Sequence, residues 1–117
     1  MSVRSLTKIT NFTAEEVLQL FEWAGAMRKD RATDRGILSG RVMALFSEKP
    51  SLRTRFTFEV GMYHLGGTSV FLTNQDINIG KREPVKDVAR NLERWADVVV
   101  ARTNAQSTIE QLAAYGS

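Results

Sequence analysis

Apolar residues follow two spacings along this chain, one typical of helices and the other of short buried strands. Thr13-Ala14-Glu15-Glu16 has the form of a capping box, which predicts that a helix begins there. The apolar residues that follow recur at helical spacing and predict one face packed on a core: Val17, Leu20, Phe21, Ala24 and Met27. A basic connection from Arg28 to Arg35 then ends at Gly36.

A short apolar run from Arg41 to Phe46 predicts the first strand. Gly40 and Pro50 lie on either side of it, and we expect it to be buried on both faces of a parallel sheet. A buried helix is the alternative, which the brevity of the run disfavours. Ser51 suits an N-cap and Gly66-Gly67 a C-terminal stop, so a second helix is predicted between them. Its apolar stripe consists of Leu52, Phe56, Val60 and Tyr63.

The rest of the chain repeats strand and helix. Thr68 to Leu72 and Asp97 to Ala101 read as strands, Pro84 suits the start of a helix, and the capping box from Ser107 to Glu110 predicts a last helix. We expect one α/β domain over residues 1–117, with three layers in the order α-β-α and a parallel sheet in the middle layer. The helix after Pro84 has an apolar stripe that we expect to pack in the core: Val85, Val88, Ala89, Leu92 and Trp95. We expect core packing for Trp23 as well.

Composition excludes several kinds of chemistry. The chain has no cysteine, which excludes disulfides and thiolate ligands, and its one histidine, His64, cannot form a multi-histidine metal site. No apolar run reaches the roughly 20 residues of a membrane span, and no signal peptide follows Met1, so we expect a cytoplasmic protein that binds no membrane. The net charge of +3 is scattered rather than gathered in a stripe, which favours small anions over nucleic acid.

The turn from residue 47 to residue 55 meets the main condition for a ligand site. In open parallel sheets ligands bind beyond the carboxyl ends of strands, where helix N-termini offer N–H groups and partial positive charge. Ser51 and Thr54 add hydroxyl donors, and Arg53 adds a fork of donors that matches phosphate. The turn therefore predicts a site for a small phosphate ester. An ordinary N-cap with solvated arginines is the alternative.

Two further arginines differ in their predicted roles. Arg55 lies four residues before Glu59, and this spacing predicts a structural ion pair along the helix. Arg102 follows the third strand and satisfies the same strand-end rule, although a salt-bridged surface arginine is the alternative. Nucleotide binding is disfavoured, because the sequence contains neither of the usual glycine-rich phosphate motifs.

The segment from Glu48 to Arg55, with Phe58-Glu59 and Leu65-Gly66-Gly67 after it, resembles the Ser-Thr-Arg-Thr-Arg signature region of the aspartate and ornithine carbamoyltransferases. Similar residues continue in order at 80–83, 87–92 and 97–103, so the likeness covers nearly the whole chain. The ornithine type is the more similar of the two. This resemblance implies the carbamoyl-phosphate-binding domain of such an enzyme.

The resemblance also implies roles for particular residues. Carbamoyl phosphate, or inorganic phosphate, would be bound by Ser51, Leu52 through its backbone, Arg53, Thr54 and Arg102. Arg53, Thr54 and Arg102 would be catalytic, because they would stabilise charge as an amine attacks the carbamoyl carbon. The family reaction uses no metal, no cofactor and no covalent intermediate. It belongs to amino-acid biosynthesis and arginine metabolism.

The family resemblance further implies a homotrimer, in which one loop reaches the site of a neighbouring subunit. In this chain the loop is the polar stretch from Thr73 to Glu83, and Asn78 and Lys81 are the candidates for that contact. A polar loop without such a role is the alternative. His64 does not match the catalytic histidine of the family, which belongs to a later His-Pro-Xaa-Gln segment, and we expect it on a helix surface or in packing.

Two departures from the family pattern limit the prediction. Leu52 replaces a threonine of the signature, which leaves an aspartate or N-acylornithine carbamoyltransferase open as alternatives to the ornithine enzyme. At 117 residues the chain also lacks the family's second, amino-acid-binding domain, so we expect an incomplete fragment with little or no transferase activity. A stand-alone phosphate-binding or assembly module without catalysis is the remaining alternative.

Overall fold

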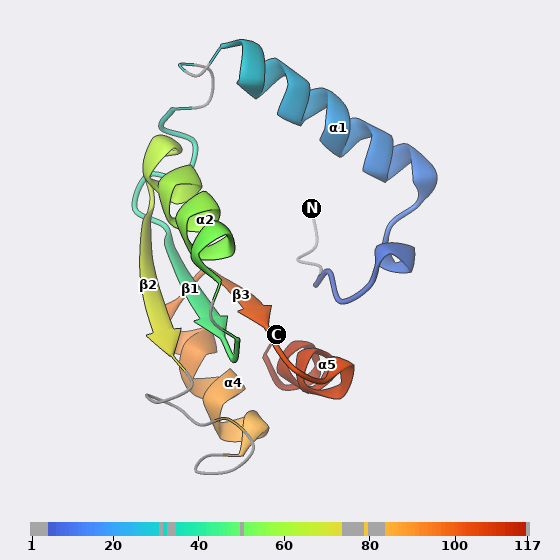
Figure 1. Ribbon diagram of the computed structural model, residues 1–117, viewed down its shortest axis with the longest axis vertical. Helices are drawn as coiled ribbons and strands as arrows, with labels where there is room; N and C mark the ends of the chain where they lie inside the picture. The colour runs from blue at the N-terminus through green and yellow to red at the C-terminus, as the bar shows by residue number, and fades with distance from the viewer. Residues whose placement is uncertain are drawn as a thin grey trace.

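A computed structural model describes residues 5–30, 32, 35–49, 51–73, 79 and 84–116 of the chain. Helices and strands alternate from α1 onward, as the sequence predicts (Figure 1). In chain order the elements are η1 (Ile9–Asn11), α1 (Ala14–Lys29), β1 (Val42–Ser47), α2 (Leu52–His64), β2 (Thr68–Thr73), α4 (Val85–Trp95), β3 (Val98–Arg102) and α5 (Gln106–Tyr115).

The three described strands form one parallel sheet with the order β2-β1-β3. β1 is the central strand, which explains why its apolar run is nearly continuous: four successive residues, 43 to 46, are buried. The register aligns Ser47 of β1 with Thr73 of β2 and with Arg102 of β3. All three strands therefore end at the same edge of the sheet.

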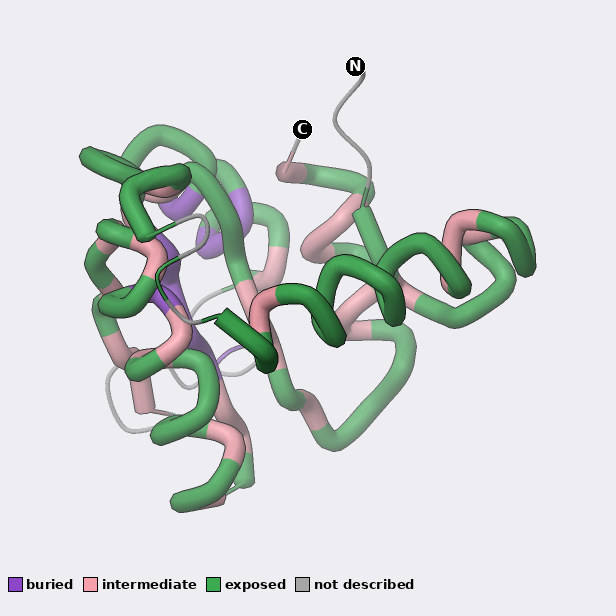
Figure 2. Tube along the Cα trace, turned by 90° about the horizontal axis from the view of Figure 1, so that it is seen from above, coloured by how far each residue is buried: buried purple, intermediate pink, exposed green. Residues whose placement is uncertain are grey.

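Alternate side chains of β1 enter two separate hydrophobic clusters. Figure 2 shows the buried stretches of the chain gathered in one part of the molecule. Ala44 and Phe46 pack with Val88 and Leu92 of α4, and Leu112 of α5 borders the same cluster. On the opposite face, the buried partners are Met43, Leu45 and Met62 of α2. Because successive residues of a strand point to opposite faces, this arrangement gives the predicted α-β-α layers.

The two glycines between α2 and β2 end the helix, as the sequence predicts. Gly66 has φ of +90°, a left-handed conformation that favours glycine. At Gly67 a Cβ atom would come within 3.0 Å of the Arg41 carbonyl oxygen, so the backbone passes β1 too closely for a larger residue. This pair of glycines lets the chain turn directly from the helix into the sheet.

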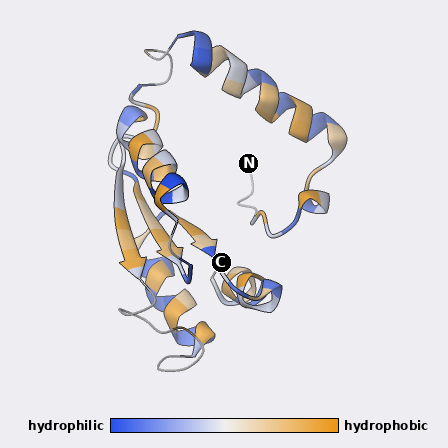
Figure 3. Ribbon diagram, in the orientation of Figure 1, coloured by the Kyte–Doolittle hydropathy of each residue, from blue (hydrophilic) through white to orange (hydrophobic). Residues whose placement is uncertain are grey.

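Helix α1 begins where the capping box predicts, but its predicted packing is wrong. The Thr13 hydroxyl accepts a hydrogen bond from the Glu16 N–H at 3.2 Å, and a Glu16 carboxylate oxygen accepts from the Thr13 N–H at 2.9 Å. No residue of α1 is buried, and Phe21 is 67% and Trp23 56% exposed. The helix lies apart from the sheet (Figures 1 and 3). Periodicity identifies an apolar face without saying what covers it.

The apolar stripe of α2 faces outward. Its four members are all exposed: Leu52, Phe56, Val60 and Tyr63. The helix instead turns Met62 and the Arg55 side chain toward the sheet. The Arg55 guanidinium lies 4.0 Å from the centre of the Phe71 ring. Long side chains that are polar only at the tip can cover apolar surface, and a hydrophobic pattern does not register them.

Two smaller predictions also fail. Trp95, expected in the core, is 69% exposed at the end of α4. The capping box at Ser107 does not form, because α5 already begins at Gln106 with Ala105 as its N-cap.

In the described part of the chain, no helix is long and apolar enough to cross a membrane.

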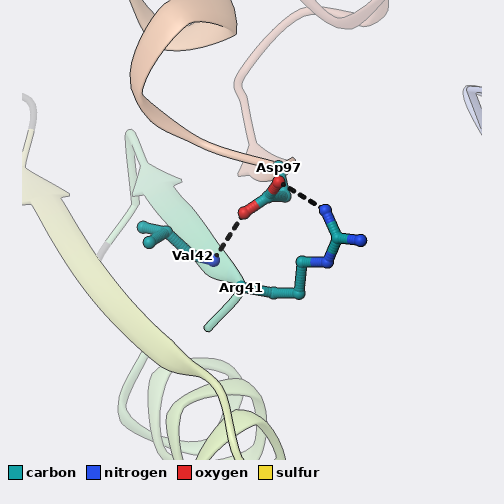
Figure 4. A network of polar contacts seen from close by, with 3 residues as sticks. All are labelled: Arg41, Val42 and Asp97. Carbon is teal, nitrogen blue, oxygen red and sulfur yellow. Dashed lines mark hydrogen bonds and ion pairs between the residues drawn. The ribbon is translucent and has the colours of Figure 1, made fainter. Parts of the chain in front are cut away.

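Asp97 fixes the start of β3 against the start of β1 (Figure 4). One carboxylate oxygen accepts from the Val42 N–H at 2.8 Å, and the other accepts from Arg41 Nη1 at 3.2 Å. The Val42 N–H, and after it the Arg41 guanidinium, hold the pKa of Asp97 below its ordinary value of 3.8. This contact secures the amino ends of both strands and thereby helps to align their carboxyl ends, where the candidate site lies.

Candidate anion-binding site

The carboxyl ends of β1 and β3 bring the two predicted site segments together. Ser47 and Arg102 are register partners at the ends of these strands, and the Glu48 N–H donates to the Arg102 carbonyl at 2.8 Å. The chain then leaves β1 into α2 and β3 into α5. Arg102 and the N-terminus of α2 therefore lie close together although about fifty residues separate them in the sequence.

Ser51 caps α2 as predicted. Its backbone is extended, with φ of −154°, and its hydroxyl oxygen accepts a long hydrogen bond of 3.4 Å from the Thr54 N–H. The N–H groups in the first turn of an α-helix have no acceptor within the helix, so those of Leu52 and Arg53 remain available to a ligand. The helix carries no acidic residue in its first turn, which leaves its partial positive charge uncompensated there.

Thr54 connects the first turn of α2 to the Arg102 side chain. Its hydroxyl oxygen lies 2.8 Å from Ser51 Oγ and 3.4 Å from Arg102 Nη1. The guanidinium can only donate, and Ser51 Oγ, which already accepts from the Thr54 N–H, is placed to donate. The Thr54 oxygen thus accepts twice, and its own proton is free to be donated to an anion. Ser51 acts mainly by orienting this hydroxyl.

The other signature residues occupy different environments. Arg53 is exposed, and within the described part of the chain its side chain makes no ion pair. Leu52 is 72% exposed, so it can contribute its backbone N–H but its side chain points to solvent. Arg55 Nε lies 3.5 Å from a Glu59 carboxylate oxygen, which confirms the predicted structural pair. Arg53 is therefore the signature arginine whose donors are available.

Glu48 and Asn104 form a contact that sequence reasoning missed. One Glu48 carboxylate oxygen accepts from the Asn104 backbone N–H at 3.2 Å, and the other accepts from Asn104 Nδ2 at 3.3 Å. A signal was present, because both residues come just after strands that end at the same edge of the sheet. The adjacent hydroxyl of Ser47 donates to the Lys49 carbonyl. These bonds order the turn between β1 and α2.

The remaining predicted candidates lie elsewhere. Asn78 and Lys81 fall outside the described residues. His64 is exposed and is the last residue of α2, which agrees with the prediction of a surface position. Among the residues that the structure describes, no three His, Cys, Asp or Glu side chains are grouped closely enough to hold a metal ion.

The chemistry of the assembled groups is that of an anion site. They comprise a hydroxyl donor at Thr54, first-turn N–H groups, and the guanidinium groups of Arg53 and Arg102. The nearby Glu48 carboxylate is occupied by Asn104. Donors of this kind bind phosphate oxygens through charge-assisted hydrogen bonds. They can also stabilise charge that develops on a carbonyl oxygen or on a departing phosphate.

Known proteins are similar to this chain in both sequence and fold. The ornithine carbamoyltransferase of Vibrio sp. (strain 2693) is 40% identical over 115 residues, which cover 98% of this chain and 38% of that protein. The crystal structure of anabolic ornithine carbamoyltransferase from Campylobacter jejuni superposes with a TM-score of 0.91 at 32% identity, over 98% of this chain and 37% of that one. The chain thus spans about two fifths of the length of such relatives.

The fold is also shared by an enzyme named for a different acceptor. The catalytic subunit of M. jannaschii aspartate transcarbamoylase has a TM-score of 0.86 at 25% identity, over 98% of this chain and 39% of that one. The sequence pattern described as "Aspartate/ornithine carbamoyltransferase, carbamoyl-P binding domain" matches residues 4–117. The chain therefore belongs to the aspartate/ornithine carbamoyltransferase family, in the part that forms the carbamoyl-phosphate-binding domain.

Proposed function

We propose that this chain binds carbamoyl phosphate at the N-terminus of α2 and serves the transfer of its carbamoyl group to the amine of ornithine. The observation that carries the proposal is the meeting of Thr54 with both Ser51 and Arg102. It places donors from two strand ends around the available N–H groups of one helix. Such convergence suits a ligand with a phosphate at one end and a polar carbonyl at the other.

Each residue has a separate role in the proposal. Arg53, the Thr54 hydroxyl and the α2 N–H groups bind phosphate oxygens, and Arg102 reaches both the phosphate and the carbonyl oxygen. A hydrogen bond to a charged group contributes about 1.5–3 kcal/mol. A few such bonds together suffice for a dissociation constant between about 1 mM and 1 μM.

In the proposed reaction the amine nitrogen forms a bond to the carbamoyl carbon, and the bond from that carbon to the phosphate oxygen breaks. Phosphate leaves with the electron pair, and the amine loses a proton. Arg102 opposes the negative charge that develops on the carbonyl oxygen, while Arg53 and Thr54 stabilise the departing phosphate. Catalysis rests on positioning and electrostatics, and the residues assembled here supply both for the carbamoyl donor.

Ornithine is proposed as the acceptor because relatives that are 40% and 43% identical to this chain are named ornithine carbamoyltransferases. The aspartate transcarbamoylase likeness and the exposed Leu52 make aspartate or an N-acylornithine the alternative acceptors. All the groups to which we assign a role bind the carbamoyl donor, and none of them binds the amine. We therefore propose that the 117 residues alone bind carbamoyl phosphate with little or no turnover.

Calorimetric titration with carbamoyl phosphate tests the donor site. We expect the wild-type chain to bind and Arg53→Ala to bind at least about 10-fold more weakly, since one charge-assisted contact is lost. Arg28→Ala is the matched control, because Arg28 is an exposed arginine in the last turn of α1. Equal dissociation constants for wild type and Arg53→Ala would refute the site.

Self-association is a second part of the proposal. The outward stripe of α2 exposes four large apolar side chains on one helical face: Leu52, Phe56, Val60 and Tyr63. Apolar patches on one face of a helix commonly mark protein contacts. We propose that this face supports a homo-oligomer, the trimer that the family resemblance implies.

A further inference from the structure

Glu48 contacts the backbone at Arg102 and again two residues beyond it, at Asn104. Its N–H donates to the Arg102 carbonyl at 2.8 Å, and its carboxylate receives the Asn104 N–H at 3.2 Å and Asn104 Nδ2 at 3.3 Å. We infer that Glu48, through Asn104, is a positioning residue that sets where Arg102 stands over the N-terminus of α2. The inference rests on the proposed binding of carbamoyl phosphate.

Arg102 needs such support because it lies at the end of its strand. The pairing of β1 with β3 ends at Ser47 and Arg102, so the strand register does not extend to the backbone beyond Arg102. The side chain itself is exposed and meets Thr54 only through a long contact of 3.4 Å. A contact that long cannot fix a flexible side chain. The position of its backbone therefore decides whether the guanidinium reaches the site.

The Glu48 carboxylate is suited to this task by its own place in the chain. Glu48 follows β1 and precedes Ser51 by three residues, so it belongs to the same turn as the phosphate donors. Asn104 follows Arg102 by two residues and presents two N–H donors to the carboxylate. One side chain thus connects the turn before α2 to the turn before α5. A displacement of about 1 Å in such a framework is enough to weaken a positioned contact.

The charge of the same carboxylate acts on the ligand in a different way. A negative charge beside a phosphate site repels the ligand, so removal of Glu48 could strengthen binding if repulsion dominated. Glu48→Gln distinguishes the two effects, because glutamine keeps an oxygen that can accept from Asn104 but carries no charge. Positioning predicts near-normal binding for this variant and weak binding for Glu48→Ala. Repulsion predicts tighter binding for both variants.

Calorimetry with carbamoyl phosphate on the full chain provides the test. We expect Glu48→Ala and Asn104→Ala to weaken binding about 10-fold, the usual size of one lost positioning contact, and Glu48→Gln to stay within about 3-fold of wild type. Glu22→Ala is the control, since Glu22 is an exposed carboxylate on α1. Its affinity should equal that of wild type. If Glu48→Ala fails to fold, Asn104→Ala still decides the question.

Combination with Arg102→Ala separates positioning from general stabilisation. If Glu48 acts through Arg102, Glu48→Ala should change the affinity less than about 2-fold in the Arg102→Ala background. An equal loss in both backgrounds would overturn the inference, as would wild-type affinity for Glu48→Ala. If Arg53→Ala still weakens binding of carbamoyl phosphate in either of these cases, the proposed function stands. If Arg53→Ala no longer weakens that binding, the proposed function itself is refuted.

Discussion

Replacement of Thr54 by valine removes the hydroxyl that both Ser51 and Arg102 contact. Valine has nearly the same shape, so the helix backbone should be retained. The N-cap bond should also persist, because the Thr54 N–H donates to Ser51 Oγ whatever the side chain at position 54. What disappears is the oxygen that accepts from Ser51 and Arg102, together with the proton available to an anion. Binding should therefore suffer much more than folding.

The size of the effect follows from the lost donor. A hydrogen bond from a hydroxyl to a charged phosphate contributes about 1.5–3 kcal/mol, which corresponds to a dissociation constant raised about 10- to 150-fold. Titration calorimetry with carbamoyl phosphate measures this change, and thermal unfolding of the same samples checks the fold. Thr54→Ser is the control, because it keeps the hydroxyl. Equal affinities for wild type and Thr54→Val, with Arg53→Ala still weakened, would show that Thr54 is no ligand.

Two further predictions concern stability and assembly. Because the pKa of Asp97 is lowered in the folded chain, the stability that Asp97 contributes is present above about pH 4 and is lost as the pH falls through the folded pKa. Thermal unfolding against pH should show a smaller acid loss for Asp97→Asn than for wild type, and identical profiles would contradict this. Phe56→Asp should shift the chain toward the monomer in size exclusion, whereas an unchanged elution volume would exclude the outward α2 face as a contact.

Local signals in the sequence were sufficient for much of the fold. The capping box at Thr13 and the N-cap at Ser51 mark helix starts through bonds between near neighbours. The continuous apolar run of β1 indicated burial on both faces, and Gly66 marked a left-handed turn. Each of these features depends on residues within a few positions of one another, so each can be predicted from the sequence.

Features that depend on distant partners were predicted less well. The stripes of α1 and α2 are apolar, yet exposed side chains such as Phe21 and Tyr63 show that spacing alone does not identify the covered face. A hydrophobic pattern does not indicate the contact between the Arg55 guanidinium and the Phe71 ring. In the site, the strand-end rule anticipated Arg102, but the Glu48 contact with Asn104 requires knowledge that β1 and β3 are neighbours.

The central claim is that carbamoyl phosphate binds between the N-terminus of α2 and the end of β3. Backbone amide shifts in nuclear magnetic resonance spectra, followed during titration with carbamoyl phosphate and with chloride at equal ionic strength, test it most directly. We predict saturable shifts that are largest at residues 51–54 and 102–104 and absent with chloride. Shifts spread evenly over basic surface residues, or none at all in these two segments, would contradict the claim.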